Sequence, residues 1–291
     1  MIRKTQKWLL GHRERIRRIM QSPEGIANRA QPGGTALPSS SLKILSFNMQ
    51  AAIGTQRYHE YVTRSWRHLY SGKTPYQQLD DIAKLIGAYH IVALQEVDGG
   101  SLRSGFVNQL AYLATQVGFE FWHQQVNRNL GQLGQFSNGL LASFIPYSVE
   151  NHRLPGLKGR GAMVMFCGHP SEPLVVVGMH LALSRKAQNL QLDYVHRLVD
   201  EFDHVIVMGD LNCNSEHLSE SHLAKSGLIH ASLGHPSYPS WKPTKEIDHI
   251  LVSPSIRINS IRTLQDVMLS DHLPIEIDIE LPEQLVRNAV G

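Results

Sequence analysis

Ser270-Asp-His-Leu-Pro-Ile-Glu-Ile-Asp-Ile-Glu-Leu281 joins an Asp-His pair to a segment in which apolar and polar residues alternate. Alternation with a period of two predicts a β-strand with one buried face, here from Pro274 to Leu281. Three earlier apolar runs also end in polar residues, at Leu94-Gln-Glu-Val97, Met179-His-Leu181 and Gly209-Asp-Leu-Asn212. Polar residues just past buried strands meet at one edge of a sheet, where loops build functional sites. The sequence therefore predicts a strand-rich fold with a polar site at a sheet edge.

In the rest of the chain before this segment, short predicted strands outnumber predicted helices. Strands are predicted at residues 43–48, 91–95, 120–125, 139–144, 162–167, 174–180, 204–208, 247–252, 256–263 and 274–281. Helices are predicted at residues 75–88, 105–116, 184–201 and 216–226. In these helices Phe106 and Leu190 should face inward, and Ser184 should cap the third helix. Two sheets packed face to face, with helices outside them, would bury the apolar faces of both sheets.

Composition places the chain among ordinary soluble globular proteins. Of its 291 residues, 42% are hydrophobic and 18% are charged, and the length is ample for one sizeable core. The two cysteines, Cys167 and Cys213, cannot form a disulfide framework and fit a reducing compartment. No apolar run reaches the ~18 residues of a membrane-spanning helix, and the N-terminus lacks the apolar core of a signal peptide. We therefore expect a monomeric, cytoplasmic protein.

The first 41 residues differ from the rest of the chain. Residues 1–20 are strongly basic, residues 21–41 are typical of a flexible linker, and residues 42–291 are predicted to form the folded domain. The basic segment has one acidic residue, Glu14, against seven basic ones: Arg3, Lys4, Lys7, Arg13, Arg15, Arg17 and Arg18. This segment would contact either an anionic inner membrane or nucleic acid. The alternative is a solvated extension without a binding role. The remainder is mildly acidic, which disfavours nucleic-acid binding through a broad positive face.

Eight short motifs, in this order, resemble the endonuclease/exonuclease/phosphatase superfamily: SFN, QEVD, SNG, RGA, MHLA, GDLN, IDHILVS and SDHLPI. The match runs from Lys43 to about Leu281. The group includes pancreatic-type deoxyribonuclease, abasic-site endonucleases, bacterial sphingomyelinases and inositol polyphosphate 5-phosphatases. The resemblance implies an α+β fold, a four-layer α/β/β/α sandwich of two mixed β-sheets with helices on both outer faces. It also makes residues 42–291 the catalytic domain.

The predicted metal ligands are Asn48, Glu96 and Asp271. Glu96 follows a run of apolar residues, where a lone carboxylate is costly unless it is paired or binds a cation. Mg²⁺, or Mn²⁺ in its place, prefers oxygen ligands and keeps several waters, so one or two carboxylates suffice. The resemblance places Asn48 in the same metal cluster, and Asp271 would serve the metal directly or through water.

His272 is the predicted general base. The resemblance pairs it with Asp248, which would orient the imidazole and stabilise its cation. Asp210 and Asn212 lie two residues apart past a strand end, so an extended backbone would point both side chains the same way. Asp210 would position the attacking water or a second cation, while Asn212 and His180 would donate to phosphate oxygens. Whether Asp210 or the His272–Asp248 dyad is the base stays open.

Two further residues are predicted to bind phosphate. Arg160 lies between glycines and could donate two N–H groups to a phosphate, although an exposed turn is the alternative. Asn138, in the SNG motif, is the second donor. The aromatic and basic segment 238–245 precedes Asp248 and would either hold a lipid headgroup or a base, or brace the loop.

The motifs favour one branch of the superfamily. Gln50 and His180 point away from abasic-site enzymes, which carry a carboxylate and often a Tyr at these places. The segments SNGLLAS and MHLALSRKAQNLQL look most like bacterial metal-dependent hydrolases near the sphingomyelinases. This resemblance implies a divalent-metal-dependent hydrolase of phosphate esters, specifically a phosphodiesterase acting on a lipid headgroup or a small molecule. A deoxyribonuclease-like endo- or exonuclease is the alternative, and a binding module without catalysis is a third.

Overall fold

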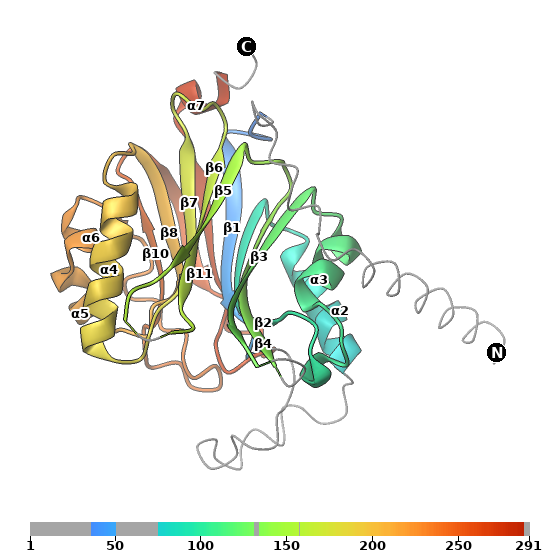
Figure 1. Ribbon diagram of the computed structural model, residues 1–291. Coiled ribbons are helices and arrows are strands. Elements are labelled where there is room, and N and C mark those ends of the chain that lie inside the picture. The colour runs from blue at the N-terminus through green and yellow to red at the C-terminus, as the bar shows by residue number, and fades with distance from the viewer. Residues whose placement is uncertain (1–35, 51–74, 131–133, 157, 288–291) are drawn as a thin grey trace.

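Two six-stranded sheets pack face to face in the computed structural model, which describes residues 36–50, 75–130, 134–156 and 158–287 (Figure 1). The strands are β1 (Ser41–Asn48), β2 (Ile91–Asp98), β3 (Phe121–Asn129), β4 (Gln135–Ala142), β5 (Ser148–Arg153), β6 (Gly161–Cys167), β7 (Leu174–His180), β8 (His204–Asp210), β9 (Ile229–His230), β10 (Asp248–Val252), β11 (Arg257–Thr263) and β12 (Ile275–Glu280). The helices are α2 (Pro75–Ile86), the short 3-10 helix η4 (Leu102–Ser104), α3 (Gln109–Val117), α4 (Arg185–Val199), α5 (Ser215–Glu220), α6 (His222–Lys225) and α7 (Glu283–Arg287).

Each sheet mixes parallel and antiparallel neighbours. The strand orders are β11-β12-β1-β2-β4-β3 and β5-β6-β7-β8-β10-β9. Each sheet has one parallel pair at its centre, β1 with β2 and β7 with β8, and α2 and α4 respectively lie between the paired strands in the chain. Parallel neighbours end at the same edge of a sheet, so the residues that follow these strands are brought together.

Three apolar clusters form between four layers. The inner faces of the two sheets bury residues such as Ile44, Leu140 and Met208 between them. Helices α2 and α3 pack on the outer face of the first sheet, and α4 packs on the outer face of the second through Leu192 and Val195. Figure 1 shows the two helical layers on opposite sides of the paired sheets. The predicted α/β/β/α sandwich is confirmed.

Several helix details differ from the sequence prediction. Helix α3 starts later than expected, because Phe106 adopts φ +64° and Asn108 caps the helix by accepting a hydrogen bond from the Ala111 amide at 3.0 Å. Phe106 is 42% exposed and Leu190 is 47% exposed, so both predictions of inward packing are wrong. Ser184 precedes α4 with an extended backbone but makes no capping hydrogen bond through its side chain.

The strands also depart from the prediction in places. Strand β5 was missed because its sequence, Ser-Val-Glu-Asn-His-Arg, is largely polar and lies at a sheet edge. Strand β2 continues past Gln95 through a register shift between Leu94 and Val97. Leu37 falls in the predicted linker, yet it is 4% exposed and packs in the core between the sheets. The packed domain therefore begins earlier than residue 42.

The predicted basic extension, most of the linker and the segment 51–74 lie outside the described residues. Among the helices of the described ranges, none is both long and apolar enough to cross a membrane.

Candidate active site

The predicted site residues meet at the edge where the central parallel strands end. Asn48 is the last residue of β1, His180 the last of β7 and Asp210 the last of β8. Asp210 lies opposite His180 on one neighbouring strand and opposite Asp248 on the other. His272 lies just before β12, a strand of the sheet that contains β1, whereas β7, β8 and β10 belong to the second sheet. Both sheets therefore supply polar side chains to the same edge.

Asp210 is the centre of the site. It is 2% exposed, and its Oδ2 accepts a hydrogen bond from Asn48 Nδ2 at 2.9 Å, which links the two sheets. The same oxygen lies 3.4 Å from His180 Nε2 and 3.9 Å from His272 Nε2. Burial raises the pKa of Asp210 to about 7, although the charge of His272 opposes the rise. Gly209 permits the close packing of β8, since a Cβ there would lie 1.9 Å from a carbonyl oxygen of β7.

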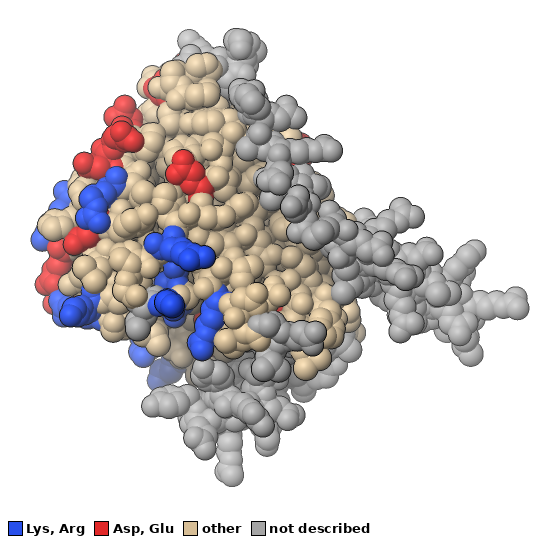
Figure 2. All heavy atoms as spheres, in the orientation of Figure 1, with Lys and Arg blue, Asp and Glu red and all other residues tan. Residues whose placement is uncertain are grey.

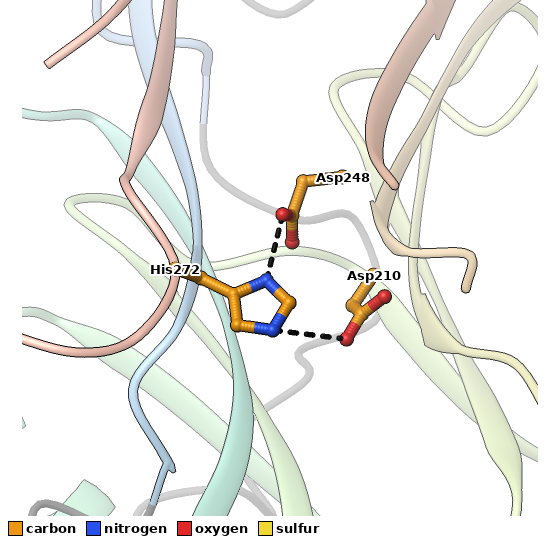
Figure 3. Close-up of side chains that lie close together, drawn as sticks. All are labelled: Asp210, Asp248 and His272. Atoms are coloured by element: carbon orange, nitrogen blue, oxygen red, sulfur yellow. Dashed lines mark hydrogen bonds and ion pairs between the residues drawn. The ribbon is translucent and has the colours of Figure 1, made fainter. Parts of the chain in front are cut away.

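The His272 ring points between two aspartates (Figure 3). Nδ1 lies 2.8 Å from Asp248 Oδ2, and Nε2 faces Asp210. The hydroxyl of Ser237 donates to the same Asp248 oxygen at 2.5 Å and fixes the carboxylate. Burial by itself would lower the pKa of His272, but Asp248 and Asp210 together raise it to about 10. The structure thus brings the predicted His272–Asp248 pair together.

Glu96 and Asp271 add two carboxylates to this edge. Glu96 lies at the irregularity in β2 with φ +56°, a conformation that redirects its side chain from the regular strand pattern. Burial raises the pKa of Glu96 and Asp271 raises it further, while a hydrogen bond with Asn48 lowers it. Burial also raises the pKa of Asp271. Partly buried carboxylates that repel each other are stabilised by a proton or by a bound cation.

The donor set fits a divalent metal ion that takes oxygen ligands. Within the described residues, Asp210, Asp248 and His272 have ligand atoms that all lie within 4.8 Å of one another. Asp248 and His272 bind each other, whereas Glu96, Asp271 and Asp210 carry carboxylates whose negative charge is disfavoured by burial. Mg²⁺ and Mn²⁺ prefer carboxylate and water oxygens. Asp210, which belongs to the close group, is therefore placed to hold such an ion, and the metal roles of Asn48, Glu96 and Asp271 stay predictions.

His180 and Arg160 are placed as donors beside these carboxylates. Burial lowers the pKa of His180 well below its usual value, and Arg160 and His272 lower it further, so the ring is neutral. Burial lowers the pKa of Arg160, while Asp210 and Glu96 raise it, which puts the guanidinium within electrostatic reach of both carboxylates. Arg160 is half-buried rather than an exposed turn residue.

Two asparagines hold the backbone of the site. Asn212 has φ +51°, so the segment after β8 is not extended as predicted. Its Nδ2 donates to the Leu181 carbonyl at 3.0 Å, and its amide donates to Asp210 Oδ1 at 3.0 Å. Asn138 Nδ2 donates to the Gly161 carbonyl at 3.3 Å. Asn212 ties the end of β8 to the end of β7, whereas Asn138, within β4, joins its sheet to the start of β6 in the other sheet. Their contacts with phosphate stay predictions.

The segment 237–245 packs against the dyad, a role that sequence reasoning left open. The Tyr238 ring lies 4.9 Å from the His272 ring, and Lys245 Nζ lies 5.6 Å from the centre of the Tyr238 ring. The Ser240 amide donates to the Asp271 carbonyl at 2.8 Å. The contribution of Ser237 to the dyad was missed, and its position just before the aromatic segment was the only sequence signal. This segment therefore braces the side chains around His272.

The sequence profile described as the Endonuclease/Exonuclease/phosphatase family matches residues 45–272, which span the whole site. The chain belongs to the endonuclease/exonuclease/phosphatase family. Members of this family are phosphoesterases and generally depend on a divalent metal ion. The protein is therefore a hydrolase of this family, with a group of side chains that could bind metal.

Solved structures of the family share this fold. A Beutenbergia cavernae endonuclease/exonuclease/phosphatase is 19% identical, with a TM-score of 0.61 over 83% of this chain and 72% of that one. The Bacteroides thetaiotaomicron mannosyl-6-phosphatase Bt3783 is 17% identical, with a TM-score of 0.63 over 82% and 99% of the two chains. D. rerio TDP2 in complex with a single-strand DNA product is 14% identical, with a TM-score of 0.61 over 83% and 100%. No curated protein is significantly similar to the chain.

Proposed function

We propose that this family member is a divalent-metal-dependent phosphodiesterase that acts on a lipid headgroup or a small-molecule phosphodiester. The observation that carries the proposal is the His272–Asp248 pair facing Asp210, with Glu96 and Asp271 at the same edge. Phosphodiester hydrolysis needs a proton acceptor for water, donors for the phosphate oxygens and compensation of negative charge. Each of these needs is matched by a side chain at this edge.

The side chains divide the work as follows. Glu96 and Asp271 would hold the metal ion, and Asp210 would position the attacking water or hold a second cation. A bound ion would neutralise the phosphate charge and stabilise the leaving oxygen. The guanidinium of Arg160 and the neutral ring of His180 donate to phosphate oxygens. The proton of the attacking water passes either to Asp210 or to Nε2 of His272 in its neutral form.

The charge distribution supports a small or membrane-bound anionic substrate. Figure 2 shows Lys and Arg side chains gathered on the lower part of one face, toward the end of the molecule at which β1 and β7 end. Among the exposed basic residues, Arg153 ends β5, Lys158 lies in the β5–β6 loop, and Lys186 lies in the first turn of α4. Outside the basic N-terminal segment the chain has more acidic than basic residues, which disfavours duplex binding through a broad positive face.

A hydrolysis panel tests the proposal. The full-length protein would be assayed with Mg²⁺, with Mn²⁺ and with excess chelator. The substrates are bis(4-nitrophenyl) phosphate, sphingomyelin and phosphatidylinositol vesicles, a sugar monophosphate, and single- and double-stranded DNA. We expect metal-dependent hydrolysis of the synthetic diester and of at least one lipid or small-molecule ester. DNA as the preferred substrate would establish the nuclease alternative, and the absence of all hydrolysis would contradict the proposal.

We further propose that residues 1–20 contact an anionic membrane. Each Lys or Arg close to such a surface contributes roughly 1 kcal/mol at most, so the seven basic residues could act together at low salt. Because Leu37 packs in the core, the matched truncation removes residues 1–35 and no more. Co-sedimentation with phosphatidylserine vesicles should weaken on truncation while hydrolysis of the soluble diester is kept. Equal sedimentation of the two proteins would make the segment a solvated extension.

A further inference from the structure

Two glutamines are buried on α4, directly behind the active-site edge. The helix follows His180 in the segment Met179-His-Leu-Ala-Leu-Ser-Arg-Lys-Ala-Gln-Asn-Leu-Gln-Leu192, and nothing in the proposed chemistry uses its polar residues. Gln188 is 3% exposed and Gln191 is 0% exposed. A buried amide must find hydrogen-bond partners, because an unpaired polar group in the interior costs about 1–3 kcal/mol. The partners of these two amides are therefore informative.

Gln191 joins two loops that carry predicted phosphate donors. Its Oε1 accepts a hydrogen bond from the Ala182 amide at 2.8 Å, and its Nε2 donates to the Pro155 carbonyl at 3.0 Å. Ala182 lies two residues after His180, and Pro155 lies in the β5–β6 loop that leads to Arg160. A backbone hydrogen bond of 3.1 Å closes that loop at its two ends. One side chain thus sets the spacing between the His180 loop and the Arg160 loop.

Gln188 joins the His180 loop to the segment after β8. Its Nε2 donates both to the Ala182 carbonyl at 2.9 Å and to the Asn212 carbonyl at 2.7 Å. The backbone N–H of Ala182 therefore donates to Gln191, and the backbone C=O of Ala182 accepts from Gln188. The backbone one residue earlier is held as well, because the Leu181 amide donates to the Asp210 carbonyl at 3.0 Å.

We propose that Gln188 and Gln191 are positioning residues, whose buried amides hold the loops of His180, Arg160 and Asn212 at the spacing that receives the phosphate group. The inference rests on the proposed phosphoesterase reaction, and it adds residues that touch neither phosphate nor metal. Helix α4 keeps its apolar contacts through Leu192 and Val195 when either amide is lost. The fold should then survive while the donors shift, and a misplacement of about 1 Å can lower a rate by about 10²-fold.

The test compares Gln188→Leu and Gln191→Leu with a matched control, His204→Leu. His204 is also buried and bonded through two side-chain atoms, but it starts β8 at the opposite end of the sheet. Full-length proteins would be assayed with Mn²⁺ and bis(4-nitrophenyl) phosphate. We expect kcat to fall by about 10- to 100-fold in both glutamine variants, with KM within about threefold of wild type, because donors aligned only in the transition state are disturbed. The control should keep kcat.

Amide hydrogen exchange supplies a readout that does not depend on hydrolysis. In the wild type the Ala182 amide is bonded to Gln191, so exchange in the peptide 181–184 should be slow, and Gln191→Leu should accelerate it by at least about tenfold. Gln191→Glu keeps an acceptor for Ala182 and loses the donor to Pro155. It should therefore keep slow exchange at Ala182 and loosen only residues 154–160, which provides a folded variant if the leucine variants fail to fold.

Two results would overturn the inference. One is an unchanged kcat in folded glutamine variants, and the other is exchange in peptide 181–184 that stays slow in Gln191→Leu. A wild-type protein without phosphoesterase activity would contradict the proposed function instead, and the exchange measurement would still decide whether the glutamines hold the loops.

Discussion

The two ends of strand β8 each bury a polar side chain, but the surroundings of the two side chains differ in charge. His204 begins the strand, and its ring nitrogens lie 2.8 Å from Ser255 Oγ and 3.2 Å from Glu172 Oε1. Asp210 ends the strand in a cluster that contains three further carboxylates, those of Glu96, Asp248 and Asp271. One end is a hydrogen-bonded structural contact, and the other concentrates negative charge.

The difference shows which polar cluster is arranged for a ligand. At the Asp210 end, burial raises the pKa of Glu96, Asp210 and Asp271. The folded protein therefore disfavours the negative charges that it brings together there. Perturbed carboxylates in one place are typical of functional sites, where stability is given up for binding or catalysis. Changes at the two ends should therefore have opposite consequences for activity and stability.

The largest expected effect is that of Glu96→Gln. Removing this carboxylate weakens the site for a cation, so metal-dependent hydrolysis should fall by at least about 10³-fold, the scale of a lost electrostatic contribution to the transition state. The metal-free variant should melt no lower than wild type, because a partly buried, repelled charge is gone. Circular dichroism melts and the diester assay check both statements. Full wild-type turnover in excess chelator would contradict a metal role.

His272→Ala and Asp210→Ala should each lower kcat by at least about 10²-fold, the scale for a general base or a positioning group. Asp248→Asn should be milder than His272→Ala, because the imidazole remains and only its orientation and the stability of its cation are disturbed. Steady-state kinetics on the three variants rank these roles. A larger loss in Asp248→Asn than in His272→Ala would count against the dyad.

The pH dependence of stability should also distinguish the two ends. The pKa of His272 is raised in the folded protein to about 10, above its usual value of 6.5. Its protonation therefore stabilises the folded protein fully below pH 6.5, and this stabilisation is lost as pH rises toward 10. In chelator, the Tm of the wild type should fall over that range, and His272→Gln should show a shallower fall. His204→Leu should keep the wild-type slope. Identical slopes for wild type and His272→Gln would contradict the assignment.

His204→Leu should have the smallest effect on activity. Losing two hydrogen bonds at a buried site should cost about 1–3 kcal/mol of unfolding free energy, while the distant active-site edge is undisturbed. Denaturant unfolding and the diester assay measure the two quantities on the same preparation. A loss of kcat comparable with that of Asp210→Ala would mean that the two ends of β8 are coupled.

The sequence predicted the residues of the site better than the residues that hold the surrounding backbone in place. His180, Asp210 and Asp248 lie at the ends of strands with regular apolar patterns, and such patterns fix where a strand ends and which edge it faces. Asn212 was placed on an extended backbone because the pattern of β8 was extended past its end, although Asn adopts positive φ more readily than most residues. Gln188 was not singled out, since its partners are backbone carbonyls outside its helix, which no sequence pattern marks.

The fold class was predicted correctly, but local boundaries were wrong where tertiary contacts or backbone geometry override the local sequence pattern. Leu37 was assigned to a linker because of its Pro- and Ser-rich neighbours, yet it finds an apolar surface near Gly168 and Leu285. Phe106 fits a helical pattern, but the turn before Asn108 places the helix start beyond it. In both cases the deciding partner is distant in sequence or depends on backbone geometry.

The most direct test of the central claim is a calorimetric titration of Mn²⁺ into metal-free wild type, Glu96→Gln and His204→Leu. The claim is that the carboxylates beyond β2 and β8 are gathered to hold a divalent cation. Wild type and His204→Leu should bind Mn²⁺ with the same Kd, and Glu96→Gln should bind at least about tenfold more weakly, since a carboxylate ligand is lost. Equal binding by all three proteins, or no binding by the wild type, would contradict the account.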